Sequence, residues 1–293
     1  MSSNKKGSVV DLRKKKVGAA IRSTVPIFFP AERKSPLRAR RRRLRALSAL
    51  LAIVLLAGAL AGVSFASYSA RYSINDISIT GAKTVSSQLI RAYVDTKIND
   101  GVNHFLSRQN IFFYPRQKIK EGIAKEIPRV RYAEVYREGM LAQAITVKII
   151  EREPFALWCP DLSCFVMDEG GFIFSKSSTS TLNLGQTFRG GIKSEKSPIG
   201  QTYLSEHFAK ILELFKRLHE AGFAPMGGEA FESDDFTVSL AEGYLVRISL
   251  SSDLNALVRN LEIALTAEPL RGKADKLEYI DLRFGNRVYY KFK

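Results

Sequence analysis

The longest hydrophobic feature of the chain is an uncharged run of 25 residues, from Ala46 to Ala70. As an α-helix rising about 1.5 Å per residue it would extend roughly 37 Å, more than a hydrocarbon core of about 30 Å requires. The pattern therefore predicts one transmembrane helix over residues 46–70. A cleaved signal peptide stays open as an alternative because "SFA" and "YSA" resemble cleavage sites, although such peptides usually have a shorter apolar run and leader.

Residues 71–150 alternate between strand-like and helix-like patterns. The segment "YSINDISITG" alternates apolar and polar positions, which predicts a strand. A helix capped by Ser86 or Ser87 follows, and a second helix starts at Pro115. A hairpin with its turn at Glu138–Gly139 completes the order β-α-α-β-β. The positions expected to share its buried face are Val130, Tyr132, Val135, Ile145, Val147 and Ile149.

Residues 151–293 also mix strands with helices. A hairpin is predicted at residues 155–168, and the Gly/Ser-rich segment "STLNLGQTFRGGIKSEKSPIGQ" is interpreted as an excursion over the surface. The segment "YLSEHFAKILELFKRLHEAGF" predicts an amphipathic helix that ends at Gly222. After a hairpin that turns at Glu242–Gly243, Asp253 caps a second helix. Two final strands are predicted on either side of Phe284-Gly285-Asn286.

These patterns predict an α+β protein with four parts. They are a disordered basic tail (1–45), a transmembrane helix (46–70), a β-α-α-β-β domain (71–150) and a second mixed α/β domain (151–293) with a largely antiparallel sheet.

Charge is concentrated in the tail. The net charge is +16, but residues 1–45 hold 15 Lys and Arg against 2 acids, while the remaining residues hold 30 against 27. Arginines directly before the apolar run follow the positive-inside rule, so we expect a cytoplasmic N-terminus and an extracytoplasmic C-terminus. Anionic lipid and topology explain these arginines, so we expect no nucleic-acid partner.

The residues give little support for an enzyme. Three scattered histidines, His104, His207 and His219, do not suggest a metal site, and no glycine-rich phosphate loop occurs. Asp168 and Glu169 could be paired catalytic carboxylates, but beside two glycines they more simply form a hairpin turn. We expect no catalytic residue, cofactor, metal or small-molecule substrate.

The two cysteines lie close enough in sequence to bridge a hairpin mouth. Cys159 and Cys164 flank "PDLS", and outside the cytoplasmic membrane oxidation is favoured. They form a possible disulfide, with free thiols in neighbouring pleats as the alternative.

At this point the sequence resembles a known family. A single span followed by a β-α-α-β-β domain looks like a POTRA domain, which is a docking module. The segment "EREPFALWCPDLSCFVMDEGGFIF" and the later "YIDLRF" are similar to motifs of the bacterial division proteins FtsQ and DivIB. The first of these motifs corresponds here to Glu151, Arg152, Pro154, Ala156, Trp158, Asp168, Gly171 and Phe174.

The resemblance implies a non-enzymatic scaffold at the division septum, single-pass in the inner (plasma) membrane. It implies partners resembling FtsB or DivIC and FtsL, and through them the septal peptidoglycan synthase complex. The alternative is a POTRA-containing adaptor for protein export or envelope assembly. For docking by the first domain we consider Ile77, Ile79, Gly81 and Ser87.

The final strand raises its own hypothesis. A last strand without a successor tends to be a sheet edge, and an uncovered edge presents unpaired N–H and C=O groups. We therefore expect a partner strand to add to it, a mode called β-augmentation. The resemblance agrees, because that family binds its FtsB-like partner around this strand. The expected partner-binding residues are Phe284, Asn286, Arg287, Val288, Tyr289 and Tyr290.

Overall fold

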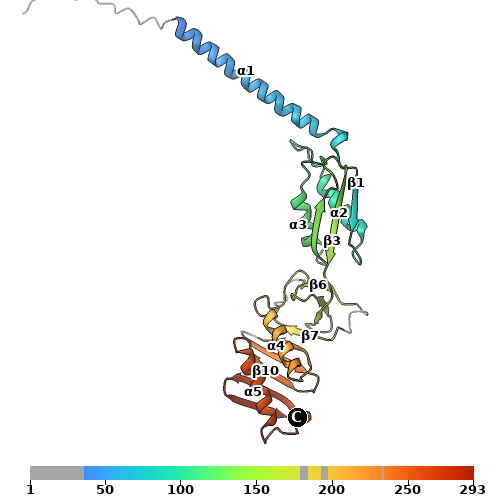
Figure 1. Ribbon diagram of the computed structural model, residues 1–293, viewed down its shortest axis with the longest axis vertical. Helices are drawn as coiled ribbons and strands as arrows, with labels where there is room; N and C mark the ends of the chain where they lie inside the picture. The colour runs from blue at the N-terminus through green and yellow to red at the C-terminus, as the bar shows by residue number, and fades with distance from the viewer. Residues whose placement is uncertain (1–35, 179–183, 193–196, 232–233) are drawn as a thin grey trace, which may run out of the picture. The chain divides into compact units, whose positions relative to one another are not determined.

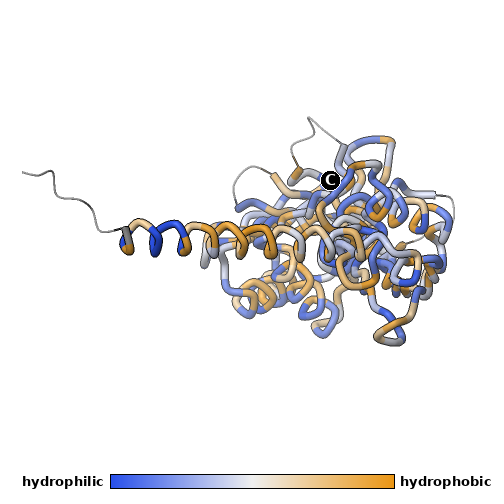
Figure 2. Tube along the Cα trace, turned by 90° about the horizontal axis from the view of Figure 1, so that it is seen from above, coloured by the Kyte–Doolittle hydropathy of each residue, from blue (hydrophilic) through white to orange (hydrophobic). Residues whose placement is uncertain are grey.

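The computed structural model describes residues 36–178, 184–192, 197–231 and 234–293 (Figure 1). Its first element is helix α1, Pro36–Ser67, which has the length and apolarity to cross a membrane. Figure 2 shows the hydrophilic start of this helix and its long hydrophobic continuation. The helix includes residues 36–45, so the prediction of a disordered tail over 1–45 is wrong for these residues, and residues 1–35 lie outside the described part. A single-pass membrane protein is compatible with this helix.

Residues 71–151 contain a separate three-stranded sheet and have the predicted element order β-α-α-β-β; we call this part the first domain and the part that follows it the second domain. A short 3₁₀ turn, η1 (Ala70–Tyr72), leads into the first domain. Its sheet has the order β1-β3-β2, in which β1 runs parallel and β2 antiparallel to β3. The elements are β1 (Asp76–Thr80), α2 (Ser87–Ile98), α3 (Arg116–Glu126), β2 (Val130–Tyr136) and β3 (Ala144–Glu151).

One face of each helix packs on the sheet of the first domain. Ile90 and Val94 of α2 and Ile119 and Ile123 of α3 are completely buried. Their spacing of four residues places each pair on a single helix face. Each helix therefore buries one apolar stripe, while Leu89 in the first turn of α2 stays exposed.

The expected face of β2 was partly wrong. The pairing of β2 with β3 is irregular between Val130 and Tyr132. An irregularity of this kind changes which side chains point inward, because side chains alternate along a strand. Ala133 and Val135 are consequently buried together with Val130, and Tyr132 lies on the surface with 41% of its area exposed.

The second domain contains a nine-stranded sheet of order β12-β11-β10-β9-β8-β7-β4-β5-β6. Five of its described pairings are antiparallel and three are parallel, so the sheet is mixed with an antiparallel majority. The strands are β4 (Ala156–Trp158), β5 (Phe165–Met167), β6 (Ile173–Lys176), β7 (Thr187–Gly190), β8 (Pro225–Ala230), β9 (Asp235–Leu240), β10 (Leu245–Ser249), β11 (Leu277–Phe284) and β12 (Arg287–Phe292).

Strand β7 corrects the interpretation of the Gly/Ser-rich segment as a surface excursion. It lies inside the sheet, parallel to both β4 and β8, and its Phe188 is completely buried. The neighbouring β8 was not predicted at all. Its Gly228 packs so closely that a Cβ there would lie 2.5 Å from the carbonyl oxygen of Thr237. Glycines in this strand serve close backbone approach and hide the usual strand pattern.

Two helices pack against this sheet and complete the core of the second domain. Helix α4 (Phe208–Glu220) starts five residues later than the predicted amphipathic segment, and α5 (Leu254–Thr266) starts where predicted. The Oδ1 atom of Asp253 accepts a hydrogen bond from the backbone N–H of Ala256 at 2.8 Å, which caps α5. Gly222, with φ of +90°, follows α4.

Candidate functional site

Strand β12 is the edge of the nine-stranded sheet, as the sequence predicted. It pairs antiparallel with β11 on one flank, and no other described strand pairs with its second flank. Along an edge strand, alternate N–H and C=O groups face outward without a ladder partner. The second flank is therefore available to a strand from another molecule.

The side chains of β12 point to two faces. Val288 and Phe292 pack against the core, and Tyr290 lies on their side of the strand. Tyr289 faces the other way and contacts Phe284 edge-to-face, with ring centroids 5.2 Å apart. Both tyrosines remain on the surface: Tyr289 is 50% and Tyr290 42% exposed, and Phe284 is 55% exposed.

An apolar hollow of about 290 Å³ lies between α5 and β12. Its α5 side includes Ile263, whose side chain is largely exposed. Asn260 at its rim donates a hydrogen bond to the carbonyl oxygen of Gly285 at 3.4 Å. The lining residues are Asn260, Ile263, Ala264, Ala267, Pro269, Leu270, Asn286, Val288 and Tyr290. The sequence did not predict the contribution of α5 to this hollow. The one indication in the sequence was Ile263, an apolar residue outside the buried face of the helix.

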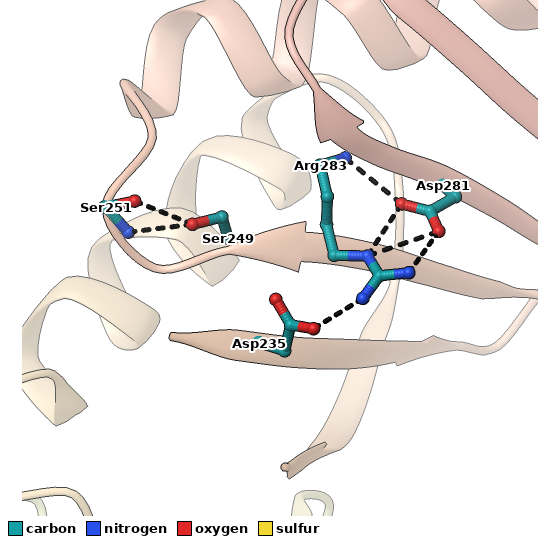
Figure 3. Close-up of polar contacts among 5 residues, drawn as sticks. All are labelled: Asp235, Ser249, Ser251, Asp281 and Arg283. Atoms are coloured by element: carbon teal, nitrogen blue, oxygen red, sulfur yellow. Dashed lines mark hydrogen bonds and ion pairs between the residues drawn. The ribbon is translucent and has the colours of Figure 1, made fainter. Parts of the chain in front are cut away.

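Arg283 fixes the end of β11 from which Phe284 projects. Its Nη2 atom lies 2.6 Å from Oδ2 of the buried Asp281, and its Nη1 atom donates to Asp235 on β9 (Figure 3). Burial alone would raise the pKa of Asp281, but the hydrogen bonds from Arg283 outweigh it and lower this pKa below its usual value. The hydrogen bond to Asp281 in turn raises the pKa of Arg283. Both groups therefore stay charged and paired.

A salt bridge and main-chain hydrogen bonds connect β12 and the residue after it to the neighbouring segment. Lys291 pairs across the strands with Glu278 at 2.6 Å, and this hydrogen bond raises the pKa of Lys291. The backbone N–H of Lys293 donates to the carbonyl oxygen of Lys276 at 2.9 Å. Because Lys291 is paired with its own sheet, it protects the edge less than a free lysine would. The groups that a partner could reach at this edge are therefore aromatic side chains and unpaired backbone N–H and C=O groups.

The docking residues predicted in the first domain lie elsewhere, along β1 and α2. Ile77 and Ile79 are half-buried against their own core, while Ser87 is exposed. Gly81 has a structural role: its φ is +80°, and a Cβ there would lie 2.3 Å from the carbonyl oxygen of Ile149. What remains accessible is the backbone edge of β1 and a hollow beside it that includes Ile77.

The motif residues Arg152 and Asp168 join the two domains. The Nη1 atom of Arg152 lies 2.5 Å from Oδ2 of Asp168, and its Nε donates to the carbonyl oxygen of Pro128 at 3.0 Å. Its guanidinium also lies over the ring of Phe172, 3.8 Å from the ring centroid. The other carboxylate oxygen of Asp168 accepts the backbone N–H groups of Gly170 and Phe172. These contacts support the hairpin-turn interpretation of Asp168.

The two cysteines are joined in the structure. Cys159 and Cys164 form a disulfide across the mouth of the β4–β5 hairpin, with Cα atoms 4.2 Å apart. The bridge closes a loop of a few residues, and none of the residues predicted to bind a partner lies in it. It is a local staple of the hairpin.

No family model fits the chain, and no curated protein matches it. The resemblance to FtsQ and DivIB accordingly rests on the motif residues and their order along the chain. The open edge of β12 and the hollow beside it are features of the structure that do not depend on the resemblance.

Proposed function

We propose that the chain is a non-enzymatic scaffold of bacterial cell division, similar to FtsQ and DivIB, which binds a partner strand on the outer flank of β12. The single observation that carries this proposal is the open edge of β12, flanked on both faces by half-exposed aromatic rings. The motif order around Glu151–Phe174 and at "YIDLRF" supports the choice of family. The β-α-α-β-β order of the first domain suits the export-adaptor alternative equally well, so the β12 edge and these motifs are what favour the division role.

Strand addition would use the free backbone groups on the outer flank of β12 and the side chains on its two faces. Main-chain hydrogen bonds to β12 would supply register and affinity, and alternate side chains of the added strand would supply specificity. Side chains of the added strand on the α5 side would meet the hollow lined by Ile263 and Tyr290, which suits an apolar side chain. Side chains of the added strand on the opposite face would meet Phe284 and Tyr289. The proposed partner is an FtsB- or DivIC-like protein, with FtsL and the septal peptidoglycan synthase reached through it.

Binding to β12 can be tested by titrating the soluble ectodomain with the extracytoplasmic segment of the FtsB-like partner. Aromatic anchors at an interface centre often cost about 2 kcal/mol or more when truncated. We therefore expect Phe284→Ala and Tyr290→Ala each to weaken binding by about 30-fold. Tyr132→Ala is a matched control, because Tyr132 has the same exposure as Tyr290 but lies in the first domain. Folded F284A and Y290A proteins that bind as tightly as the control would exclude the edge as the docking site.

A second surface belongs to the proposal. The open edge of β1 and the hollow beside α2, with Ile77, Ile79 and Ser87, would recruit the protein to the septum through earlier division proteins. Deleting residues 72–150 should then abolish midcell localisation of a fluorescently tagged protein while leaving it in the membrane. Midcell rings formed by the deleted protein would contradict this part of the proposal.

Depletion separates the division role from the export alternative. Cells that lose a division scaffold should grow as filaments, because septation fails while elongation continues. Loss of exported or envelope proteins without filamentation would instead favour the adaptor.

A further inference from the structure

The loop between α2 and α3 is fastened to the end of α1. The Oγ atom of Ser64 donates to the carbonyl oxygen of Phe105 at 2.6 Å, and the hydroxyl of Tyr68 donates to that of His104, also at 2.6 Å. The buried Asn110 donates its side-chain amide to the carbonyl oxygen of Ser67 at 2.8 Å. This loop is therefore held beside the last turns of the apolar helix.

The β2–β3 turn lies at the same end of the first domain. The side-chain amide of Gln143 donates to the carbonyl oxygens of Ala70 and Arg71, at 3.0 and 2.9 Å. Arg137 connects the turn with the α2–α3 loop. Its Nη1 atom donates to the carbonyl oxygen of Met140 at 2.7 Å, and its guanidinium lies over the ring of Phe112, 5.3 Å from the centroid.

Exposed apolar side chains are concentrated in these segments. We call this group the membrane-proximal cap; it has one member on α1, three on the α2–α3 connection and two in the turn. All six side chains are exposed to solvent, from Phe112, which is 47% exposed and partly covered by Arg137, to Phe65, which is 85% exposed. They are Phe65, Val102, Phe105, Phe112, Met140 and Leu141.

The depth of the cap follows from α1. Arg45 is the last charged residue before the apolar run, and Ser64 lies 18 positions after Ala46. At about 1.5 Å per residue they span about 27 Å, close to the thickness of a hydrocarbon core. Because Phe105 is hydrogen-bonded to Ser64, it would lie at the level where hydrocarbon gives way to headgroups if α1 spans the bilayer from Ala46.

We infer that the membrane-proximal cap inserts into the headgroup region of the bilayer and docks the first domain on the lipid surface. Lipid is the occupant because the cap continues directly from the membrane-spanning helix. Aromatic side chains favour this interface, and apolar side chains gain by burial in it. The guanidinium of Arg137 lies over the ring of Phe112 in the cap, where a lipid phosphate would pair with it. The inference goes beyond the proposed division role and does not depend on it.

The test uses the full-length protein in vesicles of phosphatidylcholine and phosphatidylglycerol, with no other protein present. A single cysteine replaces Phe105 or Met140 and carries an NBD fluorophore, and the native cysteines do not react because they form a disulfide. The control is Leu89→Cys, because Leu89 is 56% exposed against 57% for Phe105 but lies in the first turn of α2. Replacing Phe105 keeps the bond from Ser64, which goes to the backbone.

We expect nitroxide-labelled phosphatidylcholine to quench the probe at positions 105 and 140 several-fold more than at position 89, and we expect bluer emission there. If quenching at 105 and 140 is no stronger than at 89, lipid does not cover the cap and the inference is wrong. A second variant combines Phe105→Asp with the probe at position 140. Its quenching should fall several-fold, and undiminished quenching would contradict a cap that docks as one surface.

Discussion

Glu151 offers the sharpest test of how the first domain is held together. Its Oε1 atom accepts the backbone N–H groups of Lys83, Thr84 and Val85 at 2.6, 2.8 and 2.9 Å, and Arg129 approaches its Oε2 at 3.4 Å. Burial opposes ionisation, but these donors outweigh it and lower the pKa of Glu151 from 4.5 to about 2. Such a difference corresponds to about 3 kcal/mol of stability at neutral pH.

Glu151→Gln should therefore destabilise the first domain by about 2 kcal/mol, because a neutral amide oxygen keeps the bonds but accepts them more weakly. Urea unfolding of the soluble ectodomain measures the loss, and amide exchange at residues 83–85 locates it. The nearby exposed Glu153→Gln is the control and should change little.

The pH dependence of this effect has a defined sign. Since the folded protein lowers the pKa, the stabilisation is complete above the unfolded value near 4.5 and disappears as the pH falls toward 2. The stability difference between wild type and E151Q should shrink in that window. A difference that is constant from pH 7 to pH 3, or faster exchange in the E153Q control, would refute this account of the carboxylate.

Other predictions concern the backbone, the buried ion pair and the topology. Gly81→Ala should cost about 2–3 kcal/mol in thermal or urea unfolding, more than Gly101→Ala, which has a similar positive φ but open space around it. Arg283→Ala should destabilise the second domain by about 3 kcal/mol, because it leaves a buried carboxylate without its partner, and Arg283→Lys should recover part of this stability. A phosphatase reporter should be active after Lys293 and inactive before Arg40, and the reverse pattern would contradict the proposed topology.

Periodicity predicted the elements of the first domain because its helices and strands are half-buried, with one apolar face each. The sequence could not show the irregularity in β2, since Tyr132 continues the alternation in the letters while the backbone changes register. In the second domain β7 and β8 escaped detection because glycines replace side chains where neighbouring strands approach closely. Phe188 was the one strong apolar signal in β7, and a single buried residue is too little to identify a strand.

The candidate site was also only partly predictable from the sequence. The place of β12 at a sheet edge could be predicted, because it follows from strand order. The hollow beside it could not, since Ile263 and Tyr290 meet only through the packing of α5 on the sheet. Gly81 was proposed for docking from its place at the end of a strand. The reason for a glycine there became visible only with Ile149 beside it.

The membrane-proximal cap and the β12 edge are connected by a short series of contacts along the chain. Bonds between Ser64 and Phe105 and from Gln143 to Arg71 hold the first domain at the end of α1. The pair of Arg152 with Asp168, largely shielded from water, then connects the first domain to the second. A flexible linker near residue 151 would let the β12 edge search a large volume, whereas contacts of this kind limit that volume and would raise the effective concentration of the edge toward a partner anchored in the same bilayer. The contacts at α1 and at Arg152 would therefore strengthen binding between two membrane-anchored proteins without touching the interface itself.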